Sequence, residues 1–126
     1  MSFDPISIIV NNPLSIDNST LQKLNELQIE FTFNELPGPD EDEEFQKTDE
    51  IQRLQSAMND LLNVLVENIL RNPSKLWVLS QFKNTLEIIE NEDTEARELF
   101  GIYLEKIMSI LGIESSDGLL AFYLGT

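Results

Sequence analysis

Residues 51–70, with the sequence IQRLQSAMNDLLNVLVENIL, decide the fold class of the chain. Apolar side chains recur in this stretch at every third or fourth position, which is the period of an α-helix. The main stripe consists of Ile51, Leu54, Met58, Leu61, Leu65 and Ile69. In the second half it is widened by Leu62, Val64, Val66 and Leu70. A helix that is apolar almost all round packs on several sides, so the sequence predicts a central helix from about Thr48 to Asn72.

Two neighbouring helices are predicted from caps and apolar stripes on either side of this stretch. Ser19 and Gln22 have the spacing of a capping box, which predicts a helix from about Ser19. Asn72 and Pro73 predict the end of the central helix and the start of the next, with Asn as the cap and Pro at the first helical position. The inward stripe of that next helix is predicted to consist of Leu76, Leu79, Phe82, Leu86 and Ile89, with Trp77 and Ile88 at its flanks.

The C-terminal third predicts a fourth main helix and a short final one. Thr94 or Asp93 is suited to cap the fourth helix, and Gly112 is suited to end it. The final apolar piece, Leu119 to Leu124, predicts a short helix that packs back on the others. We therefore expect an all-α bundle of four main helices with short N- and C-terminal pieces, forming one domain over residues 1–126. Residues expected to face the core from the fourth helix are Leu99, Phe100, Tyr103, Leu104, Ile107, Ile110 and Leu111.

Two short segments depart from the helical period. The apolar run from Ile6 to Val10 fits either a strand or one turn of helix. Further on, Ile29, Phe31 and Phe33 alternate with polar residues, which is the period of a β-strand. This alternation predicts a short strand at Ile29–Phe33.

The chain is strongly acidic. It has 23 acids against 8 bases, which gives a net charge of −15 at pH 7. Such a field repels nucleic acid and anionic membranes and attracts basic proteins. The first residues lack the basic region of a signal peptide, and no segment reaches the roughly 20 apolar residues of a membrane span. We expect a cytoplasmic protein that binds neither nucleic acid nor membranes.

Cysteine and histidine are both absent from the sequence. The absence of cysteine excludes disulfides, thiolate metal sites and cysteine nucleophiles. The absence of histidine excludes the common nucleophile and base pairs, so carboxylates are the main candidates for acid–base chemistry. No catalytic signature appears, and we expect neither an enzyme nor a bound cofactor.

The acidic residues are concentrated in two segments, which are the candidate partner-binding residues. The first follows Pro37 and Pro39, which fix the backbone angle φ and lack amide donors, so we expect a solvated loop there. The second lies at the predicted turn between the third and fourth helices. A solvated connection is the alternative reading of both segments. The binding candidates are Asp40, Glu41, Asp42, Glu43 and Glu44 in the first segment, and Glu90, Glu92, Asp93, Glu95 and Glu98 in the second.

The first segment has part of the pattern of a calcium-binding EF-hand loop. Asp40, Asp42 and Glu44 have the spacing of its first three ligands. However, Phe45 stands where the loop needs glycine, and Ile51 stands where it needs glutamate. The pattern therefore fails at the two positions that define the site.

A second carboxylate pattern resembles the magnesium motif of the all-α nucleoside-triphosphate pyrophosphohydrolases. It pairs Glu87 with Glu90 and Glu114 with Asp117, and the resemblance implies a magnesium-dependent hydrolase. Glu114 and Asp117 depart from the family pattern because they lie in a predicted turn and not on a helix. This metal site is the alternative to a binding function.

Trp77 is a further candidate for binding, because it lies off the main stripe at the start of its helix, where a half-exposed indole can anchor a partner.

The C-terminal third of the sequence carries a family resemblance. Glu95-x-x-Glu98, the run Tyr103 to Met108, the run Leu111 to Leu120 and the terminal Tyr123-Leu124-Gly125 are similar to a small bacterial helical family known as a domain of unknown function. This resemblance implies a helical fold and no catalytic residue.

In its size, acidity and lack of motifs the chain also resembles the immunity proteins of bacterial toxin systems. That resemblance implies a basic protein partner, such as a toxin domain directed at nucleic acid. We therefore expect an acidic protein-binding module, with an immunity or inhibitor protein as the most concrete form. The alternatives are the carboxylate–magnesium hydrolase and a helical protein with another binding role.

Overall fold

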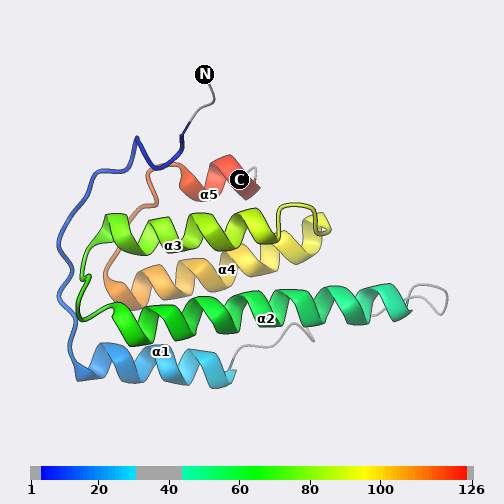
Figure 1. The fold of residues 1–126 in the computed structure, drawn as a ribbon, viewed down its shortest axis with the longest axis horizontal. Helices are drawn as coiled ribbons and strands as arrows, with labels where there is room; N and C mark the ends of the chain where they lie inside the picture. The colour runs from blue at the N-terminus through cyan, green and yellow to red at the C-terminus, as the bar shows by residue number, and fades with distance from the viewer. Residues whose placement is uncertain (1–3, 31–43, 125–126) are drawn as a thin grey trace.

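The computed structural model describes residues 4–30 and 44–124, and these residues form five helices and no sheet (Figure 1). The helices are α1 (Asn18–Glu30), α2 (Glu44–Asn68), α3 (Lys75–Ile88), α4 (Thr94–Leu111) and α5 (Leu119–Leu124). The one β-type pairing in this part of the chain is an isolated bridge between Pro13 and Ser74. The predicted all-α fold class is therefore confirmed.

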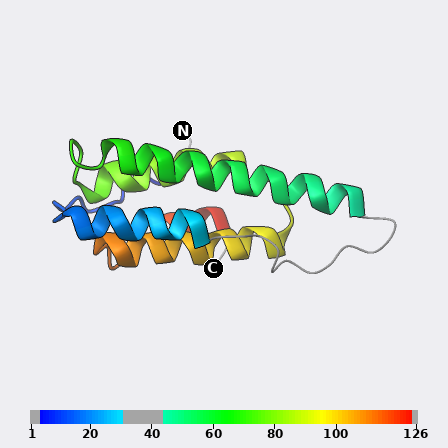
Figure 2. The same ribbon diagram turned by 90° about the horizontal axis from the view of Figure 1, so that it is seen from below.

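Successive helices run in opposite directions along the bundle axis (Figure 1). α2 contacts α1, α3 and α4, which agrees with the prediction of a helix that packs on several sides, and α4 likewise contacts three helices. α1 lies beside α4 when the bundle is seen from below (Figure 2). The short α5 contacts both α3 and α4. This arrangement is an up-and-down bundle closed by a small C-terminal helix.

The core consists of the apolar stripes of these helices. The side chains of Leu54, Met58 and Leu65 on α2 have no exposed surface, and neither does that of Ile69 just after the helix. One side of its second half nevertheless remains in solvent, because Val64 is 37% exposed; Leu70, beyond the end of the helix, is exposed as well. The side chain of Ile51 lies outside the described residues. The other fully buried large side chains include Leu24, Leu62, Leu79, Phe82, Leu86, Ile89 and Phe100.

The predicted start of α1 was close, but the predicted cap was wrong. The helix begins at Asn18, and the carboxylate of Asp17 accepts hydrogen bonds from the backbone N–H (2.8 Å) and the hydroxyl (3.0 Å) of Thr20. Asp17 therefore performs the capping role that the sequence pattern assigned to Ser19. The same hydrogen bonds lower the pKa of Asp17 below its ordinary value.

The predicted boundary between α2 and α3 was also wrong. α2 ends at Asn68, and α3 is capped by Ser74, whose hydroxyl accepts the N–H of Trp77 at 3.2 Å. Pro73 does not start the helix because its carbonyl accepts the N–H of Leu14 at 2.7 Å. The N-terminal segment thus hydrogen-bonds with the backbone of this turn, and α3 begins two residues after Pro73, at Lys75. At the other end, α2 begins at Glu44, four residues before the predicted Thr48.

Neither candidate strand is present in the described residues. Residues 5–8 form a turn, in which Ser7 N–H donates to the carbonyl of Asp4 at 3.0 Å. Ile29 belongs to the last turn of α1 and is 86% exposed, so the predicted strand does not include this residue. Phe31 and Phe33 lie outside the described residues.

The C-terminal part agrees with the sequence analysis. Gly112 ends α4 in the left-handed conformation at φ 78°, which favours glycine. The predicted helix Leu119–Leu124 packs on the bundle through a close approach to α4. A Cβ atom placed on Gly101 would lie 2.7 Å from Cδ1 of Leu124, so the bare glycine makes room for α5.

Candidate functional site

The fold brings the second acidic segment beside two acids of α2, Asp49 and Glu50, at one end of the bundle. The first half of α2 and the turn between α3 and α4 lie at this end (Figure 1). We call this region the acidic end. Its described carboxylates are Asp49, Glu50, Glu90, Glu92, Asp93, Glu95 and Glu98, and its two described cations are Arg53 and Arg97.

Glu50 joins α2 to the start of α4. Glu50 is only 4% exposed, and its Oε1 accepts a hydrogen bond from the backbone N–H of Asp93 at 2.9 Å. Asp93 is the N-cap residue of α4 but makes no capping hydrogen bond through its own side chain. The carboxylate of Glu50 therefore lies at the positive end of the α4 dipole, where a negative charge is favourable.

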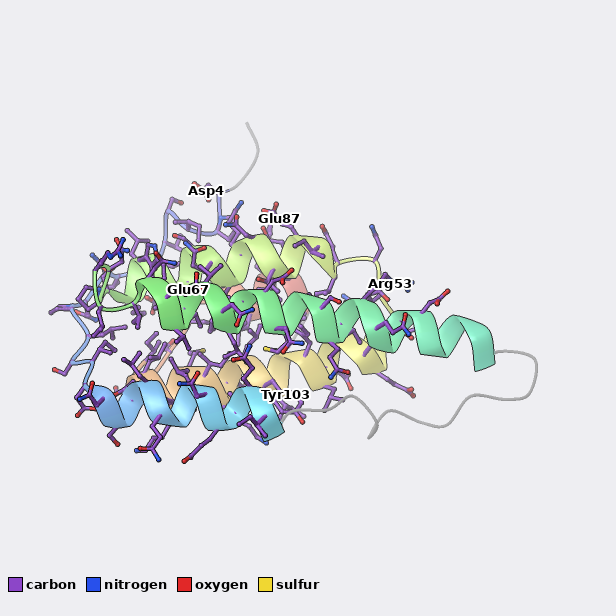
Figure 3. The ribbon with its side chains drawn as sticks, turned by 60° about the horizontal axis from the view of Figure 1, so that its bottom comes forward. Asp4, Arg53, Glu67, Glu87 and Tyr103 are labelled. Carbon is purple, nitrogen blue, oxygen red and sulfur yellow. The ribbon has the colours of Figure 1, made fainter. Side chains whose placement is uncertain are left out.

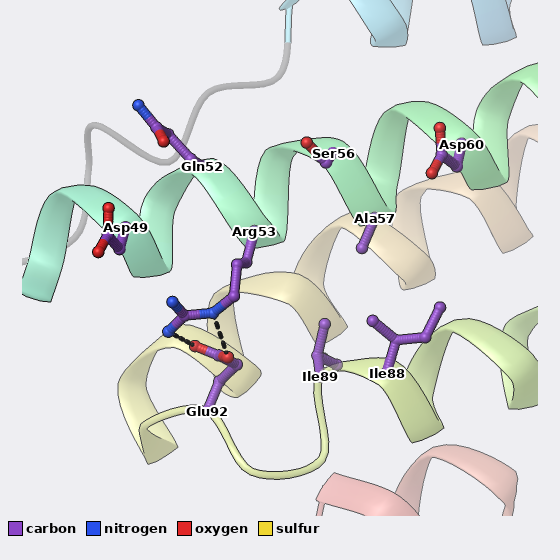
Figure 4. Close-up of a pocket in the computed structure, with 9 residues that line it drawn as sticks. All are labelled: Asp49, Gln52, Arg53, Ser56, Ala57, Asp60, Ile88, Ile89 and Glu92. Atoms are coloured by element: carbon purple, nitrogen blue, oxygen red, sulfur yellow. Dashed lines mark hydrogen bonds and ion pairs between the residues drawn. The ribbon is translucent and has the colours of Figure 1, made fainter.

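Arg53 makes the second connection, through an ion pair with Glu92. Its Nε donates to Oε1 at 2.8 Å and its Nη2 donates to Oε2 at 2.9 Å, so the pair is bidentate (Figure 4). This hydrogen bonding raises the pKa of Arg53 further above its already high value. The Arg53 side chain is 57% exposed and that of Glu92 only 12%. Solvent therefore weakens the pair, but its geometry fixes the turn against α2.

Arg97 holds the same turn from the side of α4. Its Nε donates to the backbone carbonyl of Glu92 at 3.1 Å, and its Nη1 donates to the carbonyl of Tyr123 at 3.4 Å. Both guanidinium groups of the acidic end are thus engaged by the protein itself. The exposed carboxylates around them face solvent at Asp49, Glu90, Asp93, Glu95 and Glu98.

The structure does not test the five candidates of the first acidic segment. Asp40, Glu41, Asp42 and Glu43 lie outside the described residues. Glu44 is the first residue of α2, and its side chain is not described. The role of these five acids stays a prediction.

A groove of about 460 Å³ runs between α2 and the end of α3, beside the Arg53–Glu92 pair (Figure 4). We call it the α2–α3 groove. Ala57 points toward Ile88 and Ile89 across it. Ala57 and Ile89 are buried beneath the surface, whereas Ile88 is 71% exposed. The residues of α2 that line the groove are Asp49, Gln52, Arg53, Ser56, Ala57 and Asp60.

The structure does not assemble the alternative magnesium site. Glu87 accepts hydrogen bonds from Lys83 of the same helix and from the hydroxyl of Tyr123, and both lower its pKa. Asp117 forms an ion pair with Lys75 at 2.7 Å. No group of three or more carboxylates suited to a metal ion exists among residues 4–30 and 44–124, a range that contains Glu90 and Glu114 as well. The geometry implied by the resemblance to the pyrophosphohydrolases is therefore absent.

Trp77 lies in the first turn of α3, whereas the acidic end adjoins the last turn of that helix. Its indole is half-buried and packs against the core. The structure therefore does not bring Trp77 together with the acidic candidates, and its role as an anchor stays a prediction.

Sequence reasoning missed the residues that connect the acidic end. Arg53 and Glu92 are 39 residues apart, and Glu50 and Asp93 are 43 apart, so no local pattern links them. A weaker signal was present in the spacing of Asp49, Arg53, Ser56 and Asp60, which places them on one face of a helix. The small residues Ser56 and Ala57 next to each other also indicate a hollow on that face.

None of the described helices is both long and apolar enough to cross a membrane.

The fold and the acidic end together define a small all-α helical bundle with a strongly acidic surface at one end. Residues 15–126 match the family described as Domain of unknown function (DUF4844), and the chain belongs to this family. No curated protein and no solved structure matches the chain.

Proposed function

We propose that the chain is a cytoplasmic protein-binding module that uses the acidic end to bind a basic protein. In its most concrete form it is an immunity or inhibitor protein that covers a basic toxin domain. The observation that carries the proposal is that Glu50 and Arg53 of α2 hold the second acidic segment, 39 to 43 residues later in the sequence, against the acidic first half of α2 as one surface. The proposed role is binding and not catalysis.

The electrostatics of the acidic end support this proposal. Its two guanidinium groups are already engaged, so exposed carboxylates dominate the outward field. Like charges that lie close together repel one another and destabilise the folded state. The chain keeps this acidic surface despite a net charge of −15, which supports a role for it in binding. Carboxylates arranged in this way increase the rate at which a basic partner associates.

The bidentate Arg53–Glu92 pair also shows the chemistry that a partner can use. A guanidinium group with two parallel N–H donors matches a carboxylate of the same surface. Arginine residues of a partner can bind the exposed carboxylates nearby in the same manner.

The experiment compares two variants with the same change in net charge. The test variant carries Glu90→Gln, Glu95→Gln and Glu98→Gln, all at the acidic end. The control carries Glu26→Gln, Glu67→Gln and Glu105→Gln, which are exposed positions away from it. Figure 3 shows Glu67 and Arg53 in opposite halves of α2.

Partners captured from a native lysate at low salt are identified, and their association rates are then measured with both variants. We expect the test variant to lose on the order of tenfold in association rate at low salt, and the control to lose far less. The difference should shrink as the Debye length falls below about 10 Å. Equal rates for the two variants would show that the acidic end has no role in binding.

A further inference from the structure

We infer that the α2–α3 groove is the docking site for a basic amphipathic helix of the partner. This inference rests on the proposed function and names the segment of the partner that the surface recognises. It depends on three observations: the hollow itself, an exposed isoleucine at its edge, and carboxylates near both of its ends.

The hollow and its edge offer apolar contact. Ser56 and Ala57 are small, so α2 leaves space opposite the end of α3. The side chain of Ile88 is 71% exposed beside this space, although the neighbouring Ile89 is buried. A volume of about 460 Å³ accommodates several side chains of an incoming helix. Covering Ile88 would remove apolar surface from water, which favours association.

The carboxylates define the charges that an occupant needs. Asp49 and Asp60 are exposed, line the groove and form no ion pair with another described residue. They are eleven positions apart on α2, which places them on the same face at a separation of about 16 Å along the axis. A partner helix with two Lys or Arg residues three turns apart, and apolar residues between them, matches this spacing.

A basic helix suits the groove better than a second copy of this chain or an anionic ligand does. A second copy of this chain would bring two surfaces of the same sign together, and the net charge of −15 opposes that. An anionic ligand is disfavoured for the same reason. Arg53 is the one cation among the described residues that line the groove, and it is already bound to Glu92.

The test uses a designed helical peptide as the probe. The peptide carries two lysines three turns apart and leucines between them on the same face. A control peptide has the same composition, with its leucines moved to the opposite face. Binding is measured by fluorescence anisotropy, and the site is located from the amide NMR shifts of the protein.

Two pairs of variants accompany the peptides. Ile88→Ser removes the exposed apolar contact, and Ile102→Ser on α4, which is 50% exposed, is its control. Asp49→Asn with Asp60→Asn removes the two end charges, and Glu67→Asn with Glu105→Asn is the control for net charge. Because all six positions are exposed, thermal melting should confirm that every variant remains folded.

We expect the matched peptide to bind the natural chain more tightly than the control peptide does. Ile88→Ser should weaken the binding of the matched peptide roughly tenfold. The Asp49 and Asp60 double variant should weaken it and flatten its salt dependence. The control variants should have little effect, and the shifted amides should lie around Ala57 and Ile88.

The remaining outcomes separate the two proposals. If both peptides bind equally and Ile88→Ser has no effect, the docking inference is wrong while the acidic end remains a binding surface. If neither peptide binds at low salt, both proposals fail. A dimer that Ile88→Ser dissociates in sedimentation experiments would show that the groove binds a second copy, which would overturn the assignment to a basic partner.

Discussion

Leu65 is the single residue on which the central position of α2 can best be tested. Its side chain has no exposed surface, and α2 contacts three other helices. We expect Leu65→Ala to lower the free energy of unfolding by about 2 to 5 kcal/mol, because truncation leaves a cavity as well as losing apolar burial. Val64→Ala, at the partly exposed neighbour, should cost about 1 kcal/mol or less. Chemical denaturation measures both, and equal small losses would place this face of α2 outside the core.

Asp117 gives the stability of the chain a specific pH dependence. Its ion pair with Lys75 and its hydrogen bond from the N–H of Val10 at 2.8 Å hold its pKa below its ordinary value of about 3.9. The ionised carboxylate therefore stabilises the fold above about pH 4, and this stabilisation is lost as the pH falls through the lowered pKa. Asn at this position tolerates the local φ of 53°.

We therefore expect Asp117→Asn to lower the melting temperature at pH 7. The difference from the natural chain should diminish as the pH is lowered below about 4, since both proteins then carry a neutral side chain at this position. Asp60→Asn, at an exposed position, is the control. A difference that stays constant from pH 7 to pH 3 would mean that the charge of Asp117 does not contribute.

At the scale of elements, the start of α4 depends on a residue of α2. Glu50→Ala removes the acceptor for the N–H of Asp93, and we expect a loss of about 0.5 to 2 kcal/mol, the range for a missing helix cap. Glu50→Gln keeps an amide oxygen and should lose less. Glu67→Ala, on an exposed part of the same helix, is the control. Equal stability of the two Glu50 variants would show that this hydrogen bond is not important.

The seating of α5 on α4 can be tested by a double-mutant cycle between Gly101 and Leu124. Alanine favours a helix interior over glycine by up to about 1 kcal/mol, but a Cβ at Gly101 would lie 2.7 Å from Leu124. We expect Gly101→Ala to be stabilising in a Leu124→Ala background and less favourable in the natural chain. Denaturation of the four proteins measures the coupling. Identical effects in both backgrounds would show that α5 does not approach α4 closely.

The sequence predicted elements better than it predicted their boundaries and connections. Periodic apolar stripes identified the helices, because burial of one face depends on local spacing. The cap of α3 was misplaced because the carbonyl of Pro73 accepts a hydrogen bond from the N–H of Leu14. These residues are 59 positions apart, so a local sequence pattern cannot predict the contact. The second acidic segment was recognised, but its attachment to α2 through Arg53 and Glu92 depends on how the helices pack.

For the whole molecule, the charge of −15 should make stability sensitive to salt. Raising the ionic strength from about 0.01 M to about 1 M shortens the Debye length from about 30 Å to about 3 Å. We expect the melting temperature to rise as self-repulsion is screened. The variant with Glu90, Glu95 and Glu98 changed to Gln should respond less than the control variant with Glu26, Glu67 and Glu105 changed. Equal responses would indicate that the acidic end carries no excess of repulsion.

The N-terminal segment binds two turns that are far from it in the sequence. The backbone carbonyl of Asn12 accepts a hydrogen bond from the N–H of Lys75. The N–H of Val10 donates to the carboxylate of Asp117, which is 107 residues later in the chain. A contact of such long range requires the closure of nearly the whole chain, which is entropically unfavourable early in folding. During synthesis on the ribosome, Val10 therefore cannot bind Asp117 until α1 to α4 have been made. We expect the complete attachment of the N-terminal segment to be one of the last steps of folding.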